Sequence, residues 1–170
     1  MPEPVILHPA VVHFAIALFL VSLLFDVIGD LIGNNKFHSA AWLNLIFAGI
    51  AAVAAVLSGL WAKSRAFIPP EARDTLNVHQ LMAFFIAGVI LILLFWRINA
   101  KGLLPAKGKA FYYLISLVGL GLLIIGAYHG GKLVYHYGVG VRSTVEQPKI
   151  PEKPQKNRQR PGDEFVPGKN

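Results

Sequence analysis

The chain has 170 residues, of which 55% are hydrophobic and 15% charged, and its mean hydropathy is +0.54. Soluble domains carry about 25% charged residues, so this composition argues against a soluble protein and predicts a chain that lies in a lipid bilayer. The formal net charge of +7 does not indicate nucleic-acid binding, because the basic residues lie in loops and in the C-terminal tail without a binding motif. Cysteine is absent, which excludes disulfides, thiolate-bound iron–sulphur clusters, cysteine zinc sites and thioether-attached haem.

Four apolar blocks follow one another along the chain, at residues 10–31, 40–62, 78–96 and 111–137. A transmembrane helix needs roughly 17 to 25 apolar residues, so each block is long enough to span a bilayer. Turn-forming residues separate the blocks, and Pro9 stands where the first turn of a helix tolerates proline. Short connections make consecutive helices antiparallel. We therefore predict an all-α integral membrane protein, with a four-helix up-down-up-down transmembrane bundle over residues 1–141.

The segment 142–170 differs in composition from the rest of the chain. It contains five prolines among Lys, Arg, Glu, Gln and Asn residues. This composition predicts a disordered or extended tail. A tail that is simply solvated and a tail that docks to a partner or to anionic lipid headgroups are the two alternatives.

The six histidines are distributed unevenly between the two ends of the predicted bundle. We call side one the end that holds the starts of the first and third helices, and side two the opposite end. The antiparallel order leaves only His38 on side two and places the other five on side one: His8, His13, His79, His129 and His136. At a rise of about 1.5 Å per residue, His13 and His79 lie roughly one turn inside their helices and His129 roughly two turns. Ionisable residues inside a membrane are costly and suggest a function.

Three hypotheses account for this cluster. In the first, neutral imidazoles from two helices bind the iron of one or two haems b, and Gly126 and Gly130 beside His129 leave space for the flat macrocycle. In the second, His13, His79 and His129 hold a non-haem metal ion or line the proton path of a transporter. In the third, the histidines only join the helices of a non-redox membrane subunit or anchor by hydrogen bonds.

The haem hypothesis makes His13 and His79 the preferred axial ligands. They lie at matching depth on the first and third helices, which are diagonally opposite in such a bundle. His129 is deeper, and we expect it to bond to a haem propionate or to bind a second haem with His8 or His136. Six-coordinate iron leaves no open axial site, which favours an electron carrier between a quinol or partner protein and another redox carrier over an oxygen-activating enzyme.

Charges near side two predict ion pairs and an orientation. Asp26 and Asp30 share a helix face, and we expect them to pair with basic residues at this end, Lys36, Arg97 or Lys109, with proton uptake as the alternative. The loop between Arg97 and Lys109 carries four basic residues and no acid, whereas the side-one loop mixes both signs. The positive-inside rule then predicts a cytoplasmic side two and a periplasmic histidine face in the inner membrane, although the basic tail on side one counts against it.

Three segments carry a resemblance to a known family: HPAVVHFAIALFLVSLLFD, NVHQLMAF and GGKLVYHYGVGV. They resemble a bacterial membrane family catalogued as domain of unknown function 2231, and the resemblance covers most of residues 5–141. It implies a four-helix membrane protein similar in plan to two-haem cytochromes b, in which His8, His13 and His79 match the family pattern. Some members are joined to Rieske-type iron–sulphur domains, so the resemblance implies a Rieske-type or cytochrome partner.

Overall fold

The computed structural model describes residues 4–105 and 107–141, with backbone alone for residues 4–6. Its long elements are α1 (Pro4–Ile32), α2 (Asn35–Arg65), α3 (Arg73–Asn99) and α4 (Lys109–Tyr135). A short 3-10 helix, η1 (Pro70–Ala72), leads directly into α3. The predicted tail of residues 142–170 lies outside the described residues.

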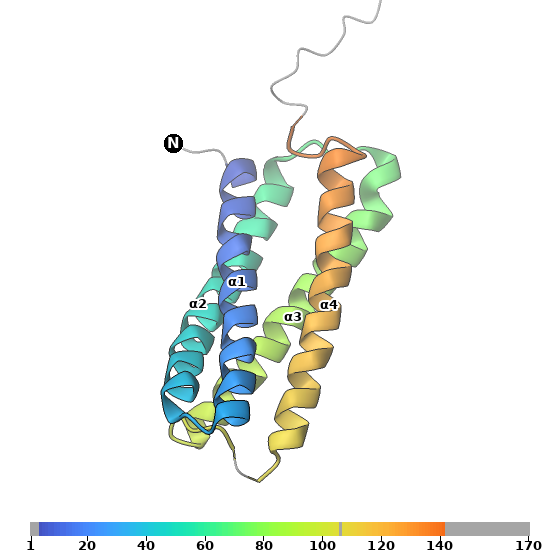
Figure 1. Ribbon diagram of the computed structural model, residues 1–170. Helices are drawn as coiled ribbons and strands as arrows, with labels where there is room; N and C mark the ends of the chain where they lie inside the picture. Colours follow the sequence, from blue (N-terminus) through green and yellow to red (C-terminus); the bar gives the residue numbers. More distant parts are fainter. Residues whose placement is uncertain (1–3, 106, 142–170) are drawn as a thin grey trace, which may run out of the picture.

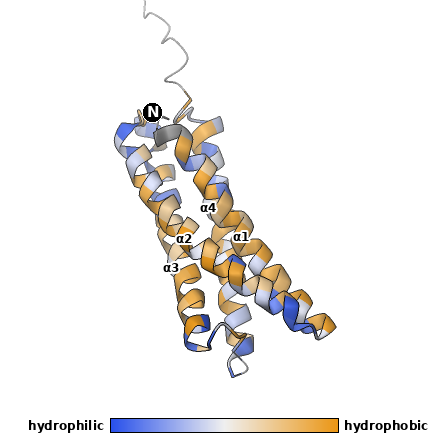
Figure 2. Cartoon of the chain, turned by 90° about the vertical axis from the view of Figure 1, so that its left-hand side faces the viewer, coloured by the Kyte–Doolittle hydropathy of each residue, from blue (hydrophilic) through white to orange (hydrophobic). Residues whose placement is uncertain are grey.

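The long helices run alternately up and down (Figure 1). Helix α1 packs most extensively on α2, and α3 on α4, while the contact between α1 and α4 is sparse. All four helices are long and apolar enough to cross a membrane. Figure 2 shows hydrophobic residues along most of their length and hydrophilic residues mainly near the ends. The structure therefore confirms the predicted all-α four-helix membrane bundle.

The helix ends differ from the predicted spans. Helix α1 begins at Pro4, so the expectation that Pro9 occupies a first helical turn is wrong, and Pro9 lies inside the helix. Helix α2 begins after Asn34, whose side chain accepts a hydrogen bond from the Lys36 backbone N–H at 3.0 Å and caps the helix. Helix α4 ends at Tyr135, before the predicted end at residue 137. Hydropathy locates the apolar part of a helix, whereas polar residues at headgroup level can extend or end it.

Small residues allow α2 to lie close to its neighbours. Ala41, Ala48 and Ala52 are buried. Gly49 faces α3, where a Cβ atom added to it would come within 2.7 Å of the Leu94 Cδ2 atom. Close approach of helix backbones is a main source of helix association in lipid, because apolar side chains gain little by leaving lipid for protein.

Asp26 connects α1 to the three other long helices at side two. Its Oδ2 atom lies 2.7 Å from Nη1 of Arg97 in α3, and both side chains are fully buried. Its Oδ1 atom lies 3.0 Å from Nδ1 of His38 in α2. The Tyr112 hydroxyl of α4 donates to Oδ2 at 3.4 Å. One buried carboxylate of α1 thus contacts all three other long helices at side two.

A second, more exposed pair lies one turn further along α1. Lys109 Nζ donates to Asp30 Oδ1 at 3.0 Å, and the Tyr113 hydroxyl donates to Asp30 Oδ2 at 2.8 Å. The expected pairing of Asp26 and Asp30 with basic residues at side two is confirmed, with Arg97 and Lys109 as the partners.

Replacing Asp26 by Ala should destabilise the fold by about 3 to 5 kcal/mol, because it leaves the Arg97 guanidinium buried without its counter-charge. Asp30→Ala should cost less than about 1 kcal/mol, because its Lys109 partner is half exposed. Reversible unfolding in mixed detergent micelles measures both free energies. Equal losses for the two variants would contradict the assignment of Asp26 as the anchor of side two.

Candidate functional site

At side one the structure brings together His8 of α1 and His79 of α3. Their ring centres lie 6.4 Å apart in an edge-to-face arrangement. The Nδ1 atom of His79 donates to the Gly126 carbonyl of α4 at 2.9 Å, and Nδ1 of His8 lies 3.1 Å from the Ser58 hydroxyl of α2. The two rings therefore lie next to each other across the bundle, and each is also bonded to a neighbouring helix.

Each of these rings packs against a glycine. A Cβ atom added to Gly59 would lie 2.9 Å from the His8 ring, and one added to Gly130 would lie 2.9 Å from the His79 ring. The sequence interpretation placed Gly126 and Gly130 beside His129. In the structure Gly126 supplies the carbonyl that holds His79, and Gly130 makes room for the same ring.

The other three side-one histidines lie nearer the surface of the chain. His13 is exposed and its Nδ1 bonds to the Pro9 carbonyl, while Nδ1 of His129 bonds to the carbonyl of Ile125 at 2.8 Å. The exposed His136 is the C-cap residue of α4, and its ring centre lies 4.7 Å from that of Tyr137. The axial pair predicted from depth, His13 with His79, stays a prediction, and the ring that lies next to His79 is that of His8.

Hydrogen bonds determine which nitrogen carries the proton in four of these rings. A carbonyl oxygen only accepts, so Nδ1 of His13, His79 and His129 must donate. The Ser58 hydroxyl gives its own proton to a backbone carbonyl of α2, so it accepts from Nδ1 of His8. In a neutral ring the lone pair then resides on Nε2. An Nδ1–H donated to the protein is the usual arrangement for a histidine that binds a metal through Nε2.

His8 and His79 are the two imidazoles that would hold the iron of a haem, if one were bound at this end. In residues 4–105 and 107–141, no three His, Asp or Glu side chains lie close enough together to hold a metal ion. Axial ligation of haem needs only two imidazoles. Two imidazoles bound to one metal at about 2 Å each hold their ring centres roughly 6 Å apart. The separation of 6.4 Å between His8 and His79 is close to this value.

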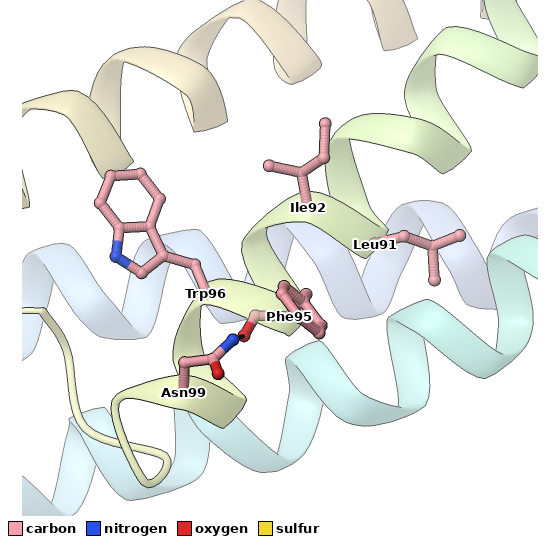
Figure 3. A pocket seen from close by; sticks show the side chains of 5 residues that line it. All are labelled: Leu91, Ile92, Phe95, Trp96 and Asn99. Carbon is pink, nitrogen blue, oxygen red and sulfur yellow. Dashed lines mark hydrogen bonds between the residues drawn. The ribbon is translucent and has the colours of Figure 1, made fainter.

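Two shallow hollows lie on the outer faces of α3 and α4. The first is almost wholly apolar, lies toward side two and is lined by Leu91, Ile92, Phe95, Trp96 and Asn99 (Figure 3). The second lies at side one and is lined by Ala127, Tyr128, Gly131, Lys132, Tyr135 and His136. Only the second includes a predicted site residue, His136, and it adds the cationic side chain of Lys132.

The sequence interpretation missed the role of His38 at side two. Its Nδ1 lies 3.0 Å from Asp26 Oδ1 and its Nε2 lies 3.4 Å from Asp30 Oδ1. The signal was present in the sequence, because the two aspartates end the first apolar block and His38 precedes the second across a short turn. An antiparallel hairpin brings such residues to the same depth.

Gly130→Ala should displace the His79 ring, because the new methyl group would meet it at 2.9 Å in a packed helix interface. We expect a loss of about 1 to 3 kcal/mol in the free energy of unfolding. Gly121→Ala is the matched control on the same helix, since a Cβ there meets nothing within 4 Å, and it should leave stability unchanged or raise it by up to about 1 kcal/mol. If the detergent unfolding curves of the two variants coincided, they would contradict the close packing of the His79 ring against Gly130.

The comparisons with known proteins agree with this architecture. No curated protein and no solved structure matches the chain. One family model, described as "Predicted membrane protein (DUF2231)", matches residues 4–143, which include the four long helices and all six histidines. The resemblance noted in the three sequence segments is thus confirmed, and the chain belongs to the family of predicted membrane proteins known as domain of unknown function 2231.

Proposed function

We propose that this protein is a membrane-embedded b-type cytochrome, which passes electrons between a quinol or a redox partner protein and another carrier. The observation that supports the proposal is the hydrogen bonding of the side-one histidines. Four rings use Nδ1 as the donor to the protein, so that each neutral ring keeps an Nε2 lone pair for a metal. When bound, a haem b supplies one-electron chemistry at its iron.

His79 is the proposed axial ligand from α3. The Gly126 carbonyl fixes its tautomer, and Gly130 leaves room for its ring beside α4. His8 is the second ligand that the spacing of the rings favours, and His13 is the alternative that the sequence predicted. His129 and His136 are the candidates for a second haem. Lys132, beside His136, would offer a cation to a propionate carboxylate.

A non-redox membrane subunit or anchor is the second candidate function. The bond from His8 to Ser58 and the bond from His79 to Gly126 each join two helices. Polar contacts between helices stabilise a bundle in lipid without any cofactor. The two candidates differ in what they predict for the colour of the protein and for the role of Nε2.

The purified protein should show a Soret band when oxidised and sharp alpha and beta bands after reduction with dithionite, as bis-histidine haem b does. Haem extraction and a pyridine haemochrome assay would count one haem or two per chain. A colourless protein from cells supplied with haem would contradict the cytochrome proposal and favour the structural candidate.

Single histidine variants test the ligands. His79→Ala should abolish the low-spin spectrum, because loss of one axial ligand leaves five-coordinate iron that is typically high-spin. We expect the same result for His8→Ala and a retained low-spin spectrum for His13→Ala. The reverse outcome for these two variants would assign the second ligand to His13. His38→Gln, at the opposite end, is the control whose spectrum should not change.

For the orientation, we propose an inner-membrane location with the histidine face in the periplasm. Helix α4 ends at side one, so a reporter fused after Asn170 reads the location of that side. Alkaline phosphatase, which folds only after export, should be active in this fusion, and a reporter restricted to the cytoplasm should be inactive. Activity of the cytoplasmic reporter alone would place the histidine face in the cytoplasm.

A further inference from the structure

The side-two cluster places one imidazole between two carboxylates of unequal exposure. Nδ1 of His38 lies 3.0 Å from Oδ1 of Asp26, and Nε2 lies 3.4 Å from Oδ1 of Asp30. The exposed fraction of the side chains rises from 0% at Asp26 to 17% at His38 and 27% at Asp30. Lys109, which pairs with Asp30, is 47% exposed. Asp30, His38 and Asp26 therefore form a series that begins near the side-two surface and ends at a fully buried carboxylate.

Charged and titratable groups from the other helices surround this path. Arg97 of α3 and Tyr112 of α4 contact Asp26, and Lys109 and Tyr113 of α4 contact Asp30. With a neutral His38, the charges of the two carboxylates and the two basic side chains sum to zero. With a doubly protonated ring the sum is one positive charge. A proton that enters the cluster therefore adds one positive charge, whether it resides on His38 or on one of the carboxylates.

Both nitrogens of the His38 ring lie near a carboxylate, whereas a hydrogen bond with a purely structural role would need only one of them. A neutral imidazole has one N–H, so it satisfies one carboxylate and leaves its other nitrogen facing an acceptor without a proton. Only the doubly protonated ring donates to both Asp26 and Asp30. Among the described residues, Nε of Arg97 is a buried side-chain nitrogen without a hydrogen-bond partner, so the guanidinium retains a free donor beside Asp26.

We propose that His38 transfers protons between Asp30 at the side-two surface and the buried carboxylate of Asp26. A neutral ring that holds its proton on Nδ1 takes a second proton at Nε2 from the Asp30 carboxyl, which is reloaded from water. It then gives the Nδ1 proton to Asp26 Oδ1. One proton enters, one leaves, no electron moves, and the ring ends neutral with its proton on Nε2. Release of the Nε2 proton and uptake of a proton at Nδ1 restore the starting tautomer.

Gly29 provides the space that such a ring needs. A Cβ atom added to Gly29 would lie 2.9 Å from both Cε1 and Nε2 of His38. The ring therefore lies directly against the α1 backbone, between the two aspartates of the same helix. The proposal concerns the end of the bundle opposite to the side-one histidines, and it does not depend on the binding of haem.

Infrared difference spectroscopy after a pH jump tests this proposal on the full chain in lipid nanodiscs. The carbonyl stretch of protonated Asp26 is assigned by its loss in Asp26→Asn. After acidification, this band should appear about tenfold or more slowly in His38→Phe, which keeps an aromatic ring but has no nitrogen to carry the proton. Asp30→Asn should also slow the appearance of the Asp26 band, because it removes the carboxylate from which His38 takes the proton.

Two further variants separate transfer from structure. His38→Gln keeps a hydrogen-bond donor beside Asp26 but accepts no transferable proton. In this variant the Asp26 band should appear as slowly as in His38→Phe. The glutamine variant therefore tests the proposal even if the phenylalanine variant folds poorly. Ser39→Ala, at the adjacent exposed residue, should protonate Asp26 at the wild-type rate. Wild-type rates in His38→Gln would overturn the proposal. So would the lack of an Asp26 band in the wild-type protein throughout the pH range in which circular dichroism shows it folded.

Discussion

The buried ion pair between Asp26 and Arg97 is the interaction on which the arrangement of the helices depends. Both side chains are fully buried at a separation of 2.7 Å, within helices that are apolar enough to span a membrane. In such surroundings an isolated charge has no water to solvate it, so each of the two groups requires the other. The pair joins α1 to α3, which are diagonal partners. It therefore constrains how the α1–α2 hairpin sits on the α3–α4 hairpin.

The same face of α1 carries the contact at the other end of the bundle. His8 and Asp26 are eighteen residues apart, which is five full turns, or about 27 Å of helix. Both side chains therefore point in the same direction, and both reach α3, one through the His79 ring and the other through Arg97. An ion pair at side two that sets the rotation of α1 also turns His8 toward His79 at side one. The charged end thus helps to position the proposed ligands.

The two ends use one residue type for different chemistry. At side one, the imidazoles donate Nδ1–H to carbonyl or hydroxyl oxygens, which leaves Nε2 with a lone pair in the neutral ring. At side two, Nδ1 and Nε2 of His38 each lie near a carboxylate oxygen. The partners of the ring, and not its depth in the membrane, distinguish the imidazoles proposed to bind a metal from the one proposed to carry a proton.

The sequence by itself determined the fold class, the four spans, their alternating direction and the end at which each histidine lies, because these depend only on the length and order of the apolar blocks. It also identified Arg97 and Lys109 among the partners of two aspartates. It did not reveal that His8, rather than His13, lies beside His79. Counting from predicted helix starts at residues 10 and 78 matched the depth of His79 to that of His13, whereas the helices begin at Pro4 and Arg73 and His8 lies beside His79. Five residues of separation also turn a side chain by about 140° around the helix axis. Which neighbour a ring meets was decided only by the packing of small residues and the buried ion pair.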